Sequence, residues 1–259
     1  MKHLQTKEAT NIQLNGEQDP FAHRFPYLYF VLFALAYILL IIFGLHLPFF
    51  DDTIIFSQQA RYFYNQDFWQ FQLPASHYTG NPELFPLYLS WLWKLFGKSL
   101  VVSHLAMVPL VLMLCWQIFL FVRRFIPEKY MLPALILLFI EPTLQAQSLL
   151  FSKSVMISAF FLMGINQIFQ RNNYWMGFAL AGLILTDLTG MVLIIAVLLS
   201  DIFISKYIME NRQSLNNKTL RPYLFVSFLL IAWILYCKFV AERIPYAFPD
   251  LHSSHNFSS

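Results

Sequence analysis

Two adjacent carboxylates, Asp51 and Asp52, are the residues of this sequence best placed to carry out chemistry. They follow an apolar segment directly, where two neighbouring acids repel each other and lose hydration unless a cation or a hydrogen-bond donor lies close. One of them can act as a general base while the other orients it or binds a divalent metal. The alternative is that both acids are solvated and only mark the end of a helix.

A second polar group, Asn81 and Glu83, lies in the stretch 79–84. Gly80, Asn81 and Pro82 form a sequence typical of a turn, and Pro82 suits the first turn of a helix that follows it. Glu83 would then lie near the positive end of the helix dipole. These two residues are candidates for substrate binding, and the start of a helix explains them equally well.

Three further ionisable residues, Glu141, Lys153 and Asp187, border or interrupt later apolar segments. Ionisable groups this close to hydrocarbon usually face a cavity or a partner charge. For Lys153 the alternative is an apolar stem with an ammonium group that reaches the aqueous surface. Histidines at metal-ligand spacing, phosphate-binding glycine loops and basic aromatic patches for nucleic acid are not found.

The composition shows which kind of structure must position these residues. Of 259 residues, 58% are hydrophobic and 12% are charged, whereas soluble domains carry about 25% charged residues. About 20 apolar residues cross a membrane as a helix, and seven segments qualify: 27–47, 100–122, 130–150, 152–169, 223–240 and the two parts of 174–203. Thr186, Asp187 and Gly190 interrupt this last run, which predicts two helices and a tight turn. We expect an all-α polytopic membrane protein, with 1–259 forming a single transmembrane domain.

The distribution of basic residues predicts the orientation of these helices. With the N-terminus in the cytoplasm, eleven of the 17 Lys and Arg residues fall in cytoplasmic segments and six in outer segments, as the positive-inside rule requires. The cytoplasmic residues are Lys2, Lys7, Arg24, Arg123, Arg124, Lys129, Arg171, Lys206, Arg212, Lys218 and Arg221, and the outer ones are Arg61, Lys94, Lys98, Lys153, Lys238 and Arg243. This orientation predicts a multi-pass protein of the cell inner membrane. It also predicts an outer loop at 48–99 and an outer C-terminal tail at 242–259.

The outer loop contains two segments with helical character. In 53–66, Phe56, Ala60 and Phe63 recur at helical spacing among polar residues, and 84–96 is apolar and aromatic but too short to span a membrane. We expect both to be interfacial helices that pack against the outer ends of the spans.

The order of these features resembles the GT-C class of membrane glycosyltransferases, and most closely the glycosyltransferase family 39 branch that includes protein O-mannosyltransferases. The matching stretches are Phe50-Asp51-Asp52, Thr79-Gly80-Asn81-Pro82-Glu83-Leu84-Phe85-Pro86-Leu87-Tyr88, Trp93-Lys94-Leu95-Phe96-Gly97-Lys98-Ser99, Arg123-Arg124-Phe125, Phe151-Ser152-Lys153-Ser154-Val155-Met156 and Leu185-Thr186-Asp187-Leu188-Thr189-Gly190. Departures are Asn81 where the family has His, Glu83 where it has Pro, and Asp187 where it has Lys. Since family members are longer, the resemblance implies that residues 1–259 correspond to their N-terminal seven-helix module.

The resemblance implies transfer of a sugar from a polyprenyl-phosphate donor to an acceptor at the outer face of the membrane. Asp51 matches the acid that activates the acceptor or helps to hold a metal ion, and Asp52 is its neighbour. The remaining expected substrate-binding residues are Arg61, Asn81, Glu83, Lys94, Lys153 and Asp187, with Arg61 and Lys153 for the donor phosphate. A divalent metal ion on Asp51 and Asp52 is the cofactor that this implies.

Two other functions fit the same sequence. A non-catalytic module could bind a lipid-linked glycan or a membrane partner, which Asn81, Glu83 and Asp187 favour because they replace family residues. A transporter would need ionisable sites near mid-membrane and internal repeats, but the acids cluster at one face. In every case membrane lipids are partners, and nucleic acid is not.

Overall fold

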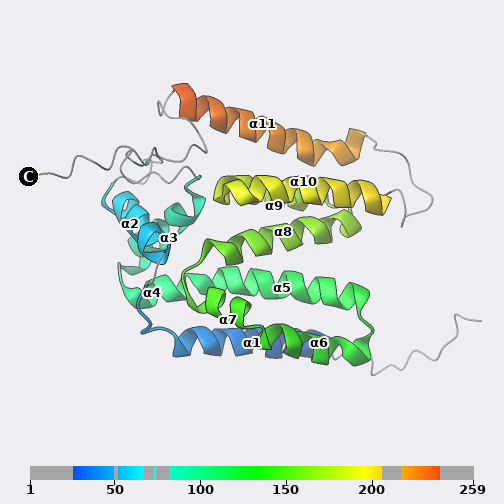
Figure 1. The fold of residues 1–259 in the computed structure, drawn as a ribbon, viewed down its shortest axis with the longest axis horizontal. Coiled ribbons are helices and arrows are strands. Elements are labelled where there is room, and N and C mark those ends of the chain that lie inside the picture. The colour runs from blue at the N-terminus through cyan, green and yellow to red at the C-terminus, as the bar shows by residue number, and fades with distance from the viewer. Residues whose placement is uncertain (1–25, 50–51, 67–72, 74–81, 206–216, 240–259) are drawn as a thin grey trace, which may run out of the picture.

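The computed structural model describes residues 26–49, 52–66, 73, 82–205 and 217–239, and every regular element in these ranges is an α-helix (Figure 1). The helices are α1 (Pro26–Phe43), α2 (Asp52–Asn65), α3 (Leu84–Phe96), α4 (Leu100–Leu105), α5 (Met107–Phe125), α6 (Glu128–Ile140), α7 (Pro142–Leu149), α8 (Lys153–Gln170), α9 (Asn173–Thr186), α10 (Leu188–Phe203) and α11 (Asn217–Phe239). The expected all-α fold class is confirmed.

The longer helices pack side by side in the order α1, α5, α8, α9 and α11, with α6 against α1 and α10 against both α8 and α9 (Figure 1). Contacts between their termini show that the chain runs back and forth. Arg123 at the end of α5 donates to Tyr27 at the start of α1. We call this the basic end of the bundle, since Arg123, Arg124, Arg171 and Arg221 lie in its terminal turns; the opposite end, covered by α2 and α3, is the capped end.

The run 174–203 divides where the sequence predicted, with α9 ending at Thr186 and α10 starting at Leu188. Asp187 is extended and accepts a hydrogen bond from the Thr189 backbone N–H, which caps α10. Gly190 lies so close to α9 that a Cβ atom there would be 2.0 Å from the Leu183 carbonyl oxygen. A tight hairpin of α9 and α10 therefore replaces one long helix.

The segment 130–150 is also divided, because α6 and α7 meet at an angle of 62°. Glu141 is extended, as expected before a proline, and its carboxylate accepts from the backbone N–H groups of Thr143 and Leu144. Within the described ranges, α4 and α5 together, Leu100–Phe125, are long and apolar enough to cross a membrane, and α6 with α7 meets that criterion only as a bent pair. The other apolar helices are shorter.

The two predicted loop helices are present, with bounds within one residue of those expected. α2 and α3 pack on each other through Phe56 against Phe85 and Tyr64 against Trp93. Phe85 also stacks on Phe151, at 4.1 Å between ring centroids, in the turn before α8. Phe56, Ala60 and Phe63 of α2 are buried, whereas Ile54 and Ile55 are exposed. The expected packing against the ends of the longer helices is present at Phe151 and Lys153.

Large apolar side chains remain exposed along the outward faces of α1, α6, α10 and α11. The most exposed include Leu137, Val192 and Phe228, at 71%, 63% and 71%. Contiguous apolar surface of this extent is unusual for a protein surrounded by water. It is the surface expected of helices that face hydrocarbon.

Candidate functional site

An ion pair at the capped end joins two residues that the sequence nominated separately. The Lys153 ammonium group, in the first turn of α8, pairs with the Asp187 carboxylate between α9 and α10. Their side chains are 22% and 7% exposed, and Lys153 Nζ also lies 5.2 Å from the centroid of the Phe56 ring on α2. Three parts of the fold therefore meet at Lys153: the start of α8, the α9–α10 turn and the cap helix α2.

Glu83 is buried beside this junction. It precedes α3 and is only 4% exposed, and Phe85, two residues later, stacks on Phe151 immediately before the α8 turn. The structure thus brings Glu83, Lys153 and Asp187 to the same region of the capped end. The sequence predicted a Glu at a helix start but gave no sign that it would be buried.

Arg61 lies on a different face of α2 from Phe56, the residue that contacts Lys153. It is five residues after Phe56, which is about 140° around the helix, and it is exposed, whereas Phe56 is buried. Arg61 instead lines an open groove of about 460 Å³ between α2 and the turn from α3 to α4. The structure does not bring Arg61 and Lys153 together, so the two expected phosphate ligands belong to different places.

The groove combines two cations with hydroxyl and apolar groups. Its lining includes Arg61, Lys98, Ser57, Ser99, Ser103, Phe49, Ile54, Leu100 and Trp93. Lys98 Nζ lies 5.6 Å from the Trp93 ring centroid, and neither Arg61 nor Lys98 forms an ion pair with a described residue. Two cations next to an apolar wall can receive a phosphate group attached to a hydrocarbon chain.

The acid pair is connected to the same groove through the chain. Phe49 and Ile54, which flank Asp51 and Asp52 in sequence, both line it. Asp52 is the first residue of α2, but its side chain lies outside the described part of the structure, as does Asp51 entirely. The segment that carries both acids therefore begins and ends at the groove wall.

Two more of the predicted substrate-binding residues are Lys94 and Asn81. Lys94 donates a hydrogen bond from Nζ to the Gln66 carbonyl oxygen and so ties the end of α3 to the end of α2. This contact gives Lys94 a structural role in the cap. Asn81 lies outside the described residues.

His104 holds two chain segments in place, the one before the acid pair and the one before Lys153. Its side chain is fully buried, and its ring nitrogens lie 2.9 Å from the carbonyl oxygens of Leu149 and Leu47. Leu47 precedes the acid pair, and Leu149 precedes the turn to Lys153. The sequence showed no histidines at metal-ligand spacing, and it gave no sign of this positioning role for His104.

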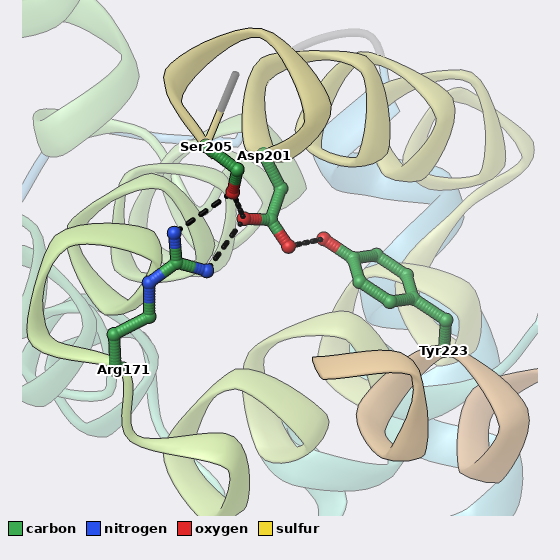
Figure 2. Close-up of polar contacts among 4 residues, drawn as sticks. All are labelled: Arg171, Asp201, Ser205 and Tyr223. Carbon is green, nitrogen blue, oxygen red and sulfur yellow. Dashed lines mark hydrogen bonds and ion pairs between the residues drawn. The ribbon is translucent and has the colours of Figure 1, made fainter. Parts of the chain in front are cut away.

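A second polar cluster, at the basic end, was missed entirely (Figure 2). Asp201 near the end of α10 is 4% exposed, accepts from Arg171 at 3.0 Å and from Tyr223 at 3.1 Å, and is also contacted by Ser205. Arg171 donates to Ser205 as well. The available signal was Asp201 itself, a single acid within an otherwise apolar run.

The described residues contain no group of three or more His, Cys, Asp or Glu side chains that could hold a metal ion. The side chains of the expected metal ligands, Asp51 and Asp52, lie outside the described part of the structure. No protein-family model, curated protein sequence or solved structure matches the chain.

Proposed function

We propose that the chain is a polytopic inner-membrane protein that transfers a sugar from a polyprenyl-phosphate donor at its capped end. Membrane insertion is supported by the exposed apolar faces of α1, α6, α10 and α11, which would be costly in water. It is further supported by the alternating course of the helices and by the gathering of arginines at one end of the bundle, which the positive-inside rule assigns to the cytoplasm.

The observation that carries the proposed reaction is the 460 Å³ groove between α2 and the α3–α4 turn. Arg61 and Lys98 supply positive charge for a phosphate group, while Phe49, Ile54 and Leu100 supply an apolar wall for the first units of a polyprenyl chain. Asp51 and Asp52 lie in sequence between Phe49 and Ile54, which both line this groove. A donor phosphate, a carrier lipid and a general base can therefore be accommodated at one place.

The proposed reaction uses these groups in one displacement. Asp51 accepts the proton of an acceptor hydroxyl, the hydroxyl oxygen forms a bond to the anomeric carbon, and the bond from that carbon to the phosphate oxygen breaks. Arg61 and Lys98 stabilise the charge left on the polyprenyl phosphate. Asp52 orients Asp51 or helps to hold a metal ion, and the Lys153–Asp187 pair supports α2 through the contact of Lys153 with Phe56.

This function predicts a large rate loss for Asp51→Asn. The amide keeps the size of the side chain but removes the base, and general-base catalysis is typically worth about 10²–10⁴-fold. Transfer of sugar from a polyprenyl-phosphate donor should fall by that factor in membranes that contain the natural full-length protein. Asp52→Asn should cost less if Asp52 only orients Asp51, and about as much if the two share a metal ion.

Removal of the positive charges in the groove should weaken binding of the donor rather than slow the chemical step. Arg61→Gln and Lys98→Gln should raise KM for the donor, because they remove phosphate contacts that are present before the reaction. Arg123→Gln, at the other end of the bundle, serves as the control and should leave transfer unchanged.

Undiminished transfer by Asp51→Asn would refute the catalytic assignment. Saturable donor binding that depends on Arg61, without transfer to any acceptor tested, would favour the non-catalytic module.

A further inference from the structure

A second groove, of about 630 Å³, lies between α9 and α11, toward the basic end. Its walls are Gly177, Phe178 and Ala181 on α9, facing Pro222 and Phe225 on α11, and its remaining lining residues are Asn173, Tyr174 and Arg221. The volume is within the range of small-molecule sites. Polar groups gather at one end of the groove, because Asn173 starts α9 and Arg221 lies in the second turn of α11.

The apolar part of the groove exists because small residues of α9 face a bulky residue of α11. A Cβ atom on Gly177 would already be in van der Waals contact with the Phe225 ring, at 3.7 Å. Phe178 and Phe225 are 51% and 54% exposed, so both rings remain accessible. The groove therefore offers an apolar strip that ends at a guanidinium group.

The polar cluster of Figure 2 holds this groove in shape. Tyr223 lies between Arg221 and Phe225 on α11, and its hydroxyl group donates to Asp201 of α10. Asp201 in turn binds Arg171, the residue that ends α8 with a left-handed backbone, φ 57°, two residues before α9 starts. The start of α11 is thus fixed relative to the start of α9, and the groove is present before any ligand binds.

Arg171 and Arg221 have different electrostatic environments. The charge of Arg171 is compensated by Asp201, whereas Arg221 is exposed and forms no ion pair with a described residue. An exposed guanidinium group at the end of an apolar strip is complementary to a phosphate group attached to an acyl chain. A lipid with a neutral headgroup would leave the Arg221 charge without a counter-charge. An anion without an acyl chain would leave the apolar strip of the groove exposed.

We propose that the α9–α11 groove is a binding site for an anionic phospholipid, with the headgroup phosphate on Arg221 and an acyl chain along Gly177, Ala181 and Phe225. This site lies at the end of the bundle opposite the proposed transfer reaction.

The test is native mass spectrometry of the full-length protein, purified in detergent and supplied with equal amounts of phosphatidylglycerol and phosphatidylcholine. The wild type should retain phosphatidylglycerol in preference. Arg221→Gln should lower that preference by at least about fivefold, since this is the effect of one basic residue near an anionic lipid. Arg221→Lys should keep most of the preference, and Ala181→Leu should lower retention of the lipid by filling the strip.

Arg123→Gln is the matched control, because Arg123 is also an exposed arginine at the basic end but lies outside the groove. It should leave the preference unchanged. Equal preference in the wild type and Arg221→Gln would overturn the proposal, and so would an equal loss in Arg123→Gln, which would indicate general surface charge. Displacement of phosphatidylglycerol by inorganic phosphate at equal concentration would show an anion site without a lipid component, and would also overturn it.

Discussion

Lys153 and Asp187 show how a residue's surroundings change what its type suggests. A lysine at the start of an apolar segment suggests a cation that reaches the aqueous surface, yet Lys153 is paired with a carboxylate that is 7% exposed. In such a place an unpaired charge costs several kcal/mol, so removing one partner harms the fold more than removing both. The pair therefore maintains the capped end, whereas Arg61 and Lys98 form no ion pair with a described residue.

Asp187→Asn tests this role at the scale of the residue. Asparagine caps a helix about as well as aspartate, so the cap on Thr189 is retained while Lys153 loses its counter-charge. We expect destabilisation on the order of 3 kcal/mol, seen as a lower thermal unfolding midpoint in detergent. The double variant Lys153→Met with Asp187→Asn should recover part of the loss. A double variant less stable than both single variants would contradict this role, and Glu128→Gln, at an exposed acid, is the control.

At the scale of elements, the hairpin of α9 and α10 places one buried acid at each end of the bundle. The hairpin places Asp187 at the capped end and Asp201 at the basic end, where each meets a cation of α8 or its terminus. The sequence predicted the break between the helices from Thr186, Asp187 and Gly190. It did not predict that both ends of α10 would form ion pairs, because those partners are distant in sequence.

Gly190→Ala tests the hairpin. A methyl group there would lie 2.0 Å from the Leu183 carbonyl oxygen, a backbone atom that cannot move aside without opening the turn. We expect a severe loss of folded protein, measured as the monodisperse fraction in size-exclusion chromatography after extraction. Gly177→Ala is the matched control, because its methyl group would make only an ordinary contact at 3.7 Å. Equal yields of the two variants would show that the close approach at Gly190 is not required.

At the scale of the whole molecule, the charge pattern and the fold agree on which loops share an end. The arginines assigned to the cytoplasm from the sequence include Arg123, Arg171 and Arg221, and the structure gathers these at the basic end. The segments assigned to the outside, among them α2, α3 and Lys153, gather at the capped end. This agreement supports the proposed orientation.

Cysteine labelling of intact cells tests that orientation. In a variant without Cys115 and Cys237, Asn65→Cys at the capped end should react with a membrane-impermeant maleimide, because Asn65 is exposed at the end of α2. Glu128→Cys at the basic end, and cysteines placed in 207–220, should react only after the membrane is permeabilised. Labelling of the 207–220 segment in intact cells would refute the seven-span orientation.

The sequence by itself determined most of the helices, the bounds of α2 and α3 and the break at Asp187. These features depend on local patterns: apolar periodicity, proline and glycine positions, and charges at the ends of apolar runs. The nomination of Lys153 and Asp187 also came from such a pattern, since an ionisable residue next to an apolar run is visible without knowledge of its neighbours.

Only the tertiary structure decided how these residues are paired. The ion pair of Lys153 with Asp187, the burial of Glu83 and the Arg171–Asp201–Tyr223 cluster all depend on which helix faces which. The separation of Arg61 from Lys153 depends on the rotation of α2 about its own axis when Phe56 packs on Phe85. Periodicity defines the apolar face of each helix, but the partner of that face is selected by packing between distant segments, and a single sequence does not display that choice.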